Sequence, residues 1–209
     1  MCGNLAGDVE SAYSYGIAGE DSWGCELASR TRATVHQYDC FDTTRPVCEV
    51  GRFVFHAECI GNKTESVASR PFDTLANQVA RNGDAGEPLI VKMDVEGAEW
   101  NSLLAAPDRV LDRIHQLLLE LHGTDERRFL HTVRKLKRTF HLVHVHFNNR
   151  ACTPGLEPFP AFAYQVLFVN KRIGLLDDSA PPPTLPHPAD APGDPAIPDC
   201  QMPSVQDQP

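Results

Sequence analysis

The sequence predicts an α/β protein of the Rossmann-like class, with a seven-stranded, mostly parallel sheet that carries helices on both faces. Three observations support this prediction. Short β-type runs alternate with segments of helical periodicity between residues 11 and 172, which is the pattern of βαβ units. The run from Leu89 to Met93 is apolar enough for a central buried strand. Polar residues follow five of the seven runs, at the strand ends where such sheets bind ligands.

The expected elements follow in chain order. Strands are expected at residues 12–16, 33–39, 52–59, 89–94, 114–121, 142–147 and 164–170. Helices are expected at residues 22–30, 72–81, 99–105 and 126–139, the last with apolar residues at helical spacing. The final two strands are joined by a loop rich in proline and glycine without a helical pattern. We therefore expect the last strand to run antiparallel, in a pair at the edge of the sheet.

The composition changes near Gly174. Ten of the 17 prolines and six aspartates follow this residue, without any lysine or arginine. This composition is typical of a disordered, extended segment. We therefore expect one folded domain over residues 1–173 and a disordered tail over residues 174–209.

The overall charge and composition exclude some classes of function. The net charge of -9 argues against a nucleic-acid partner, since such proteins normally carry a basic patch that neutralises phosphates. No apolar run approaches the roughly 20 residues that a membrane-spanning helix needs. The seven cysteines contain no CxxC pair, so a zinc site is not expected. The compartment is left open by these features.

Candidate cofactor-binding residues follow the first three strands. Gly16 and Gly19 lie in the turn after the first strand, where glycine lets the backbone approach a ligand closely. Asp39 ends the second strand, where this fold class holds an acidic residue that accepts hydrogen bonds from ribose hydroxyls. Asp42 competes with Asp39 for that role, and either can instead cap a local turn. After the third strand, Glu58 or the backbone around Ile60 is a candidate for contact with an adenine ring.

The fourth strand ends in three carboxylates, Asp94, Glu96 and Glu99. An unpaired buried carboxylate is costly, so Asp94 at least is expected to have a partner such as a ligand, a metal or a cation. Lys92 and the following helix N-terminus are the simplest partners. Glu99 is interpreted as a residue that starts the helix, where a negative charge is favourable.

Two later strand ends complete the set of candidate residues. Glu120 and His122 end the fifth strand, and the sixth carries His144 and His146 on one face, because side chains alternate along a strand. These residues are expected to line the acceptor side of the site. His144 and His146 could, together with Asp94, bind a metal or act as a general base.

The segment KMDVEGAEW, residues 92 to 100, resembles the K-[IM]-D-[VIC]-E-G-x-E motif of the FkbM-type methyltransferases, which depend on S-adenosylmethionine (SAM). The wider order of YSYGIAGEDSWG, VHQYDC, FHAECIG, QLLLELH and HVHFNN is similar to the animal methyltransferase-domain proteins of the methyltransferase-like protein 24 type. The resemblance implies SAM as cofactor, held by Gly16, Gly19 and Asp39, with Asp94 and Glu96 near the reacting methyl group. Domains of this kind usually carry helices before the first strand, so part of a lid is expected to be missing here.

The hypothesis from sequence is therefore O-methylation of a small-molecule or glycan acceptor. In this hypothesis Asp94 or His146 takes the proton, while Glu96, Glu120 and His122 position the acceptor. No metal ligands are assigned. The alternative is a catalytically silent SAM-fold protein that acts as a binding or scaffold module, and an NAD(P)-dependent oxidoreductase is disfavoured because the glycine turn lacks a third glycine.

Overall fold

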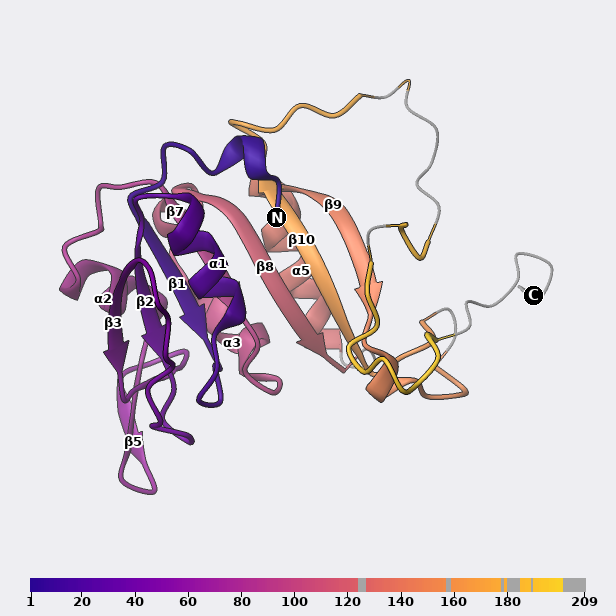
Figure 1. Cartoon of the computed structure of the whole chain (residues 1–209), viewed down its shortest axis with the longest axis horizontal. Helices are drawn as coiled ribbons and strands as arrows, with labels where there is room; N and C mark the ends of the chain where they lie inside the picture. The colour runs from indigo at the N-terminus through magenta and orange to yellow at the C-terminus, as the bar shows by residue number, and fades with distance from the viewer. Residues whose placement is uncertain (124–126, 157–158, 178, 180–184, 189, 201–209) are drawn as a thin grey trace.

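The computed structural model describes residues 1–123, 127–156, 159–177, 179, 185–188 and 190–200. Its main sheet has seven strands in the order β3-β2-β1-β7-β8-β10-β9 (Figure 1). The strands are β1 (Ser11–Tyr15), β2 (Thr34–Tyr38), β3 (Arg52–His56), β7 (Leu89–Met93), β8 (Ile114–His122), β9 (Phe140–Phe147) and β10 (Ala163–Asn170).

Strand directions confirm the predicted fold class. Strands β3, β2, β1, β7 and β8 pair in parallel, and β10 is antiparallel to both β8 and β9. The last strand thus lies between two others, while β9 forms the edge. Strands β2 and β3 extend the sheet to one side of β1, whereas β7, β8, β10 and β9 extend it to the other. The order therefore reverses between β1 and β7, and such a reversal opens a crevice for ligands at the carboxyl ends of the strands.

A second, three-stranded sheet was not predicted. It has the order β4-β6-β5 and consists of β4 (Cys59–Ile60), β5 (Glu65–Val67) and β6 (Arg70–Asp73). The expected strand at 52–59 therefore ends early, and its last residue belongs to β4. The helix expected at 72–81 begins only at α2 (Leu75–Arg81), because Phe72 pairs with Cys59 in the small sheet and Thr74 caps the helix. Strand pairing here overrides the helical pattern of the sequence.

Helices cover both faces of the main sheet. They are α1 (Ser22–Arg30), α2, α3 (Ala98–Ala105), α4 (Asp108–Leu111) and α5 (Arg127–Thr139), with short 3-10 turns at Gly3–Leu5 and Asn149–Ala151. In Figure 1 α1 lies in front of the sheet, whereas α3 and α5 lie behind it. Position 126, the first residue of the expected last helix, lies outside the described residues, and α4 was not predicted.

Each face of the sheet has its own apolar core. Leu27 and Ala28 of α1 pack with Val35 and Ile90 on one face. The larger core, on the other face, includes Trp100 and Leu103 of α3 and Leu136 of α5, among others. Among the described residues, no helix combines the length and apolarity that crossing a membrane requires.

Three disulfides join six of the seven cysteines. The pairs are Cys25–Cys48, Cys40–Cys59 and Cys152–Cys200, and Cys2 is free. The pairing was not predicted, because spacing alone does not determine connectivity. Disulfides persist in oxidising compartments, so this pattern is typical of a protein outside the reducing cytosol.

Parts of the proline-rich tail contact the domain. Asp194 forms an ion pair with Arg150. The side-chain amide of Asn149 donates hydrogen bonds to the backbone carbonyl oxygens of Asp194 and Ile197. The Cys152–Cys200 disulfide adds a covalent link to the same region. The division into a domain and a disordered tail stays a prediction, to which the structure adds these contacts.

Candidate functional site

The candidate site begins where β1 and β7 end side by side. The amide of Asp94 donates to the carbonyl oxygen of Tyr15, and the amide of Gly16 donates to that of Tyr38. A Cβ atom on Gly16 would lie 1.6 Å from the carbonyl oxygen of Asp94, and the φ angle of Gly16 is 71°. Only glycine fits this crossing. Gly16 thus sets the distance between the first turn and the strand end that carries Asp94.

A cavity of about 300 Å³ opens at this crevice, a volume at the lower end of the range for small-molecule sites. Its walls come from β1, β2, β4, β6 and β7 and the turns that follow them. They are largely apolar, with Phe41, Ile60 and Phe72 among them. Two wall residues, Ala18 and Glu96, have φ angles of 46° and 54°. Left-handed backbone at non-glycine residues is strained and gathers at ligand sites. We refer to this space as the first cavity.

One wall residue of the first cavity has an unsatisfied polar atom. The hydroxyl of Tyr15 is buried and has no hydrogen-bond partner. Buried hydroxyl groups are normally paired, and an exception calls for a ligand, water or ion. The first cavity therefore has the apolar walls and the unpaired polar group that a ligand site needs.

The structure brings three of the five predicted cofactor-binding residues to the first cavity. Gly16, Asp39 and Asp42 line it, whereas Gly19 and Glu58 do not. Glu58 forms an ion pair with Arg81 instead. Gly19 lies behind Asp42, and an added Cβ would meet the Asp42 Oδ2 atom at 3.2 Å. The backbone near Ile60, beside Glu58 in the sequence, does reach the cavity.

Asp39 and Asp42 differ in how their carboxylates are occupied. Asp39 is buried and accepts hydrogen bonds from the backbone amides of Ala18, Phe41 and Asp42, at 2.8 to 3.0 Å. Asp42 is more exposed, and its Oδ1 atom accepts from the amide of Thr44 at 2.9 Å. Asp39 thus holds the loop around the cavity, while Asp42 keeps more of its acceptor capacity for a ligand.

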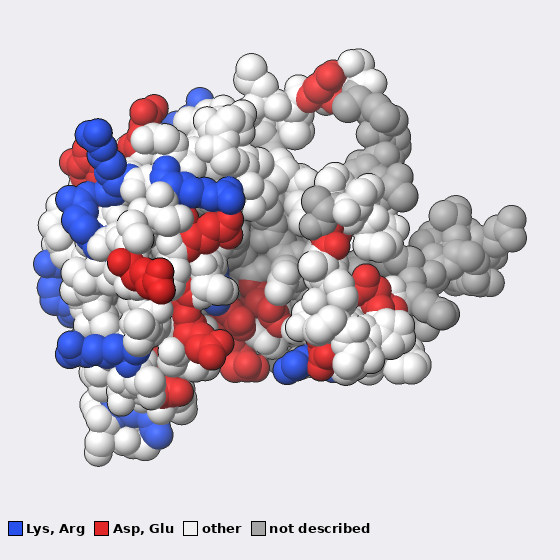
Figure 2. All heavy atoms as spheres, viewed as in Figure 1, with Lys and Arg blue, Asp and Glu red and all other residues white. Residues whose placement is uncertain are grey.

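A second cavity, of about 400 Å³, lies on the sheet face that carries α1. Its polar lining comes from five elements and the tail, and comprises Trp23, Lys92, Asp94, Glu120, His144, His146, Gln165 and Asp190. Figure 2 shows acidic side chains gathered near the centre of this view of the molecule. Asp94 lines both cavities and therefore stands at the boundary between them.

Two polar atoms in the wall of the second cavity also lack partners. They are Nε1 of Trp23 and Nε2 of His146, both buried without a hydrogen bond. His146 is 9% exposed, and the nearest carboxylate oxygen, on Asp199, is 3.9 Å from its Nε2 atom. His144, on the same face of β9 as predicted, lies 2.7 Å from Asp190 of the tail. The indole and imidazole nitrogens of these two wall residues are thus left without the partner that buried polar groups normally have.

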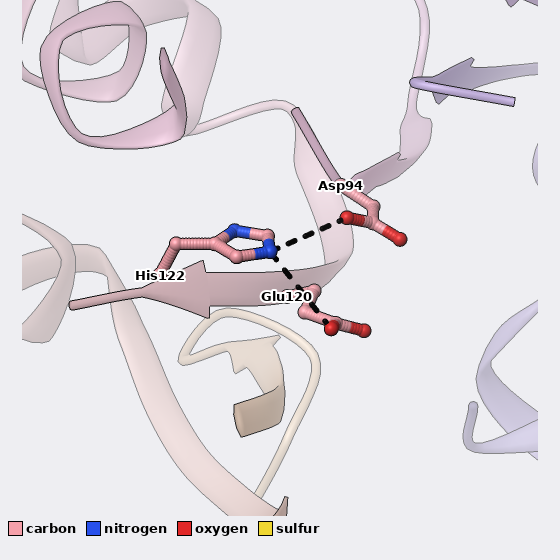
Figure 3. A group of neighbouring side chains, drawn as sticks. All are labelled: Asp94, Glu120 and His122. Atoms are coloured by element: carbon pink, nitrogen blue, oxygen red, sulfur yellow. Dashed lines mark ion pairs between the residues drawn. The ribbon is translucent and has the colours of Figure 1, made fainter. Parts of the chain in front are cut away.

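His122 joins the carboxylates at this strand end. Its Nε2 atom lies 3.9 Å from Asp94 Oδ1, 3.5 Å from Glu96 Oε2 and 3.9 Å from Glu120 Oε1. Figure 3 shows the imidazole edge turned toward Asp94 and Glu120. Both carboxylate oxygens of Glu120 are held in place, since the side-chain amides of Asn148 and Gln165 donate hydrogen bonds to them at 2.7 and 3.1 Å. Asp94, Glu120 and His122 thus converge at the ends of two neighbouring strands, β7 and β8.

Burial and charge change the acidity of this group. Burial raises the pKa of Asp94 to about 6, although the nearby Lys92 acts in the opposite direction. For His122, burial alone would lower the pKa, but its hydrogen bond to Glu99 and the surrounding carboxylates raise it to about 8. At neutral pH Asp94 is therefore a stronger base than an ordinary aspartate while remaining mostly ionised.

Glu99 starts α3 as predicted, and it has a further contact that the sequence did not indicate. Its carboxylate is fully buried and accepts from the amide of Gly97 at 2.9 Å, as a residue at a helix start does. The same carboxylate accepts from the amide of His122 at 2.8 Å and faces the His122 Nδ1 atom at 3.2 Å. Tyr15 and Trp23 were also missed. No sequence signal distinguished their unpaired polar atoms from ordinary core side chains.

The strand order and the two cavities can be compared with known proteins. The chain matches no family model, and no curated protein matches it either. Its fold resembles solved structures. An rRNA methylase from Streptococcus thermophilus shares 12% identity at a TM-score of 0.46, covering 80% of this chain and 90% of that one. The Methanococcus jannaschii fibrillarin pre-rRNA processing protein shares 9% identity at a TM-score of 0.44, with 79% and 68% covered. This likeness is one of fold.

The comparison corrects one prediction. The net charge led us to expect no nucleic-acid partner, yet both of these similarly folded proteins are named for rRNA. The physical reason is that total charge is a poor guide here, because six of the 28 acidic residues lie after Gly174 and the basic residues all precede it. The exclusion of nucleic acid from the possible partners is therefore withdrawn.

Proposed function

We propose that this chain is a SAM-dependent methyltransferase that methylates a hydroxyl group of a small-molecule or glycan acceptor. The observation that carries the proposal is the position of Asp94, which lines both the first and the second cavity. A transfer enzyme needs two ligands whose reacting atoms meet. Two adjoining cavities with one shared carboxylate meet that need.

The first cavity fits the cofactor. Phe41, Ile60 and Phe72 offer apolar contact for an adenine ring, and Asp42 offers a carboxylate for ribose hydroxyls. The unpaired Tyr15 hydroxyl offers a further hydrogen bond. When bound, SAM supplies a methyl group that leaves its sulfonium sulfur, so that the acceptor oxygen gains a carbon and the sulfur keeps the electron pair. Asp94, at the boundary, is suited to stabilise the positive charge of the sulfonium group.

The second cavity fits an acceptor rich in hydroxyl groups. Trp23 Nε1 has no partner and can donate a hydrogen bond to a ligand, and His146 Nε2 can accept or donate one. Glu120 and Lys92 add charged groups of either sign to the same walls. The hydroxyl proton must leave as the oxygen is methylated, and both of the bases predicted to take it, Asp94 and His146, line this space. His122 lies between the carboxylates of Asp94 and Glu96 and is suited to hold both of them beside the acceptor.

The disulfides support the choice of acceptor class. Three of them indicate an oxidising compartment, where glycans and secreted small molecules are present.

Calorimetry with SAM and with S-adenosylhomocysteine tests the cofactor, because a ligand that binds only the folded state must raise its stability. Purified protein with labelled SAM is then offered hydroxyl-bearing metabolites, glycans and RNA, and the product is identified by mass. We expect Asp94→Asn to bind SAM more weakly or to lose turnover. If that variant matches the unchanged protein in both measurements, the proposed centre is wrong. SAM binding without turnover on any acceptor class would instead favour a silent binding module.

A further inference from the structure

Asp94, Glu120 and His122 form a compact group of potential metal ligands. One ligand atom from each lies within 4.8 Å of the other two. The two ion-pair distances drawn in Figure 3, from His122 Nε2 to Asp94 Oδ1 and to Glu120 Oε1, are both 3.9 Å. Donor atoms bound to one ion at about 2.1 Å lie roughly 3 to 4 Å apart. A small side-chain rotation therefore suffices to place all three around one cation.

We infer that Asp94, Glu120 and His122 bind a divalent metal ion at the boundary between the two cavities. The role of this ion in catalysis rests on the proposed function, but its binding does not.

The orientation of His122 suits metal binding. The Glu99 carboxylate accepts a hydrogen bond from Nδ1–H of His122. Nε2 is then the ring nitrogen that faces Asp94 and Glu120. Metal-binding histidines commonly donate a hydrogen bond from their other ring N–H to a carboxylate in this way, which fixes the ring and its tautomer. Glu120 is likewise held by Asn148 and Gln165, and ligating carboxylates are usually hydrogen-bonded.

The local charge also favours a cation. Four carboxylates surround the imidazole, those of Asp94, Glu96, Glu99 and Glu120. Among the ion pairs of the described residues, the only other cation at this group is Lys92, whose Nζ atom is 4.0 Å from Asp94. Even a protonated His122 together with Lys92 leaves two negative charges uncompensated. A divalent ion balances that excess.

A separate observation points to a ligand at the same place. His146, buried to nine-tenths, lines the same cavity as Asp94 and Glu120, and its Nε2 atom has no hydrogen-bond partner, with Asp199 3.9 Å away. An acceptor hydroxyl bound to the ion in this cavity would have a lowered pKa. His146 is then free to take the proton while Asp94 holds the ion. One imidazole with two carboxylates suits a first-row ion such as Mn²⁺ better than Ca²⁺.

The test uses the full chain, dialysed against a chelator and titrated with MnCl₂ in the absence of SAM. Free Mn²⁺ is followed by electron paramagnetic resonance. We expect saturable binding of about one ion per chain, weakened at least tenfold in Glu120→Gln and in His122→Asn. Glu87→Gln removes an exposed carboxylate at the opposite end of β7 and serves as the matched control, with binding unchanged.

Two outcomes overturn the inference: no saturable Mn²⁺ binding by the unchanged protein, or variants that bind as it does. Circular dichroism checks that each variant is folded. If His122→Asn does not fold, Glu120→Gln alone decides whether the metal site exists. SAM binding is titrated separately in the presence of chelator. SAM binding without Mn²⁺ binding refutes the metal site alone, whereas Mn²⁺ binding without SAM binding refutes the proposed function alone.

Discussion

The Oε1 atom of Glu99 lies 3.2 Å from Nδ1 of His122 and also accepts the His122 backbone amide at 2.8 Å. One fully buried carboxylate thus fixes both the backbone and the ring of the histidine at the end of β8. The carbonyl oxygen of His122 is held as well, because Trp100 Nε1 donates to it at 2.7 Å. In the proposed site Glu99 therefore acts through His122, as a positioning residue.

Glu99→Gln is expected to lower kcat by about 10- to 100-fold, the usual effect of removing a group that orients a functional histidine. The amide has nearly the same shape but lacks the charge that holds Nδ1–H. SAM affinity should change little, because Glu99 does not line the first cavity. Glu99→Asp keeps the charge, so partial recovery of kcat is expected. An unchanged kcat in Glu99→Gln would contradict the positioning role.

Asp39 and Asp42 are expected to respond differently to neutralisation. Asp39→Asn places an amide donor against backbone amides that the carboxylate now accepts, so we expect the free energy of unfolding to fall by about 1 to 3 kcal/mol. SAM affinity should fall with it. Asp42→Asn should weaken SAM binding while stability changes by less than about 0.5 kcal/mol. Urea unfolding and calorimetry check both variants, and full SAM affinity in Asp42→Asn would remove this residue from the site.

The sequence predicts the fold well because the main sheet follows from hydrophobic periodicity. Each of the seven strands and α1 appears near its expected place, and the antiparallel last strand follows from the absence of a helix before it. The small sheet was not predicted, because β4 has two residues and β5 three. Such short runs carry no measurable period.

The candidate site was only partly predictable. Strand ends identify Asp94, Glu120 and His122, because parallel strands align their carboxyl ends. The sequence does not show that Glu58 turns to Arg81, since that depends on how α2 packs. Nor does it show that the tail reaches the second cavity through Asp190, since no periodic pattern places that residue.

Gly16→Ala is expected to cause a larger loss of stability than the same change at Gly83. Both glycines have positive φ angles, 71° and 87°, but only at Gly16 would the new Cβ meet backbone, 1.6 Å from the Asp94 carbonyl oxygen. Gly83→Ala should cost about 1 to 2 kcal/mol from the left-handed backbone alone. Gly16→Ala should cost more and also abolish SAM binding. Thermal unfolding of the two variants gives the comparison, and equal losses would show that the crossing has room to relax.

The stability of the protein is expected to fall between pH 6.5 and about 4, in part because of His56. Burial, then the neighbouring His36 and Arg81, lower the pKa of His56 from 6.5 to about 4 in the folded state. In this range the unfolded chain binds a proton at His56 that the folded chain does not, so acidification favours unfolding. His36 lies 3.2 Å away, and burial lowers its pKa too, against the opposing charge of Asp84.

His56→Gln tests this effect, because glutamine does not titrate. We expect the loss of unfolding free energy between pH 7.5 and 4.5 to shrink by about 1 to 2 kcal/mol, after allowance for partial exposure of the ring. His131→Gln, at an exposed position on α5, should keep the full pH dependence. Identical pH profiles for His56→Gln and the unchanged protein would show that other groups cause the acid sensitivity.

The disulfide Cys40–Cys59 is expected to hold the first cavity in shape. It joins the end of β2 to β4, with Cα atoms 5.1 Å apart, and Cys59 itself lines the cavity. Replacing both cysteines with serine should lower the free energy of unfolding by about 3 kcal/mol, the value for a loop of this size. The more flexible walls should weaken SAM binding as well. Cys2→Ser is the control, because Cys2 is in no disulfide.

Alkylation followed by mass spectrometry establishes the starting point for this experiment. The denatured but unreduced protein should react at one cysteine, Cys2, and the reduced protein at all seven. Thermal unfolding and SAM calorimetry are then compared between the two variants. If the double serine variant binds SAM as tightly as Cys2→Ser does, the disulfide stabilises the fold without shaping the cavity. If it also unfolds at the same temperature, the small sheet is held by its hydrogen bonds and by the Arg81 ion pairs to Glu58 and Asp73.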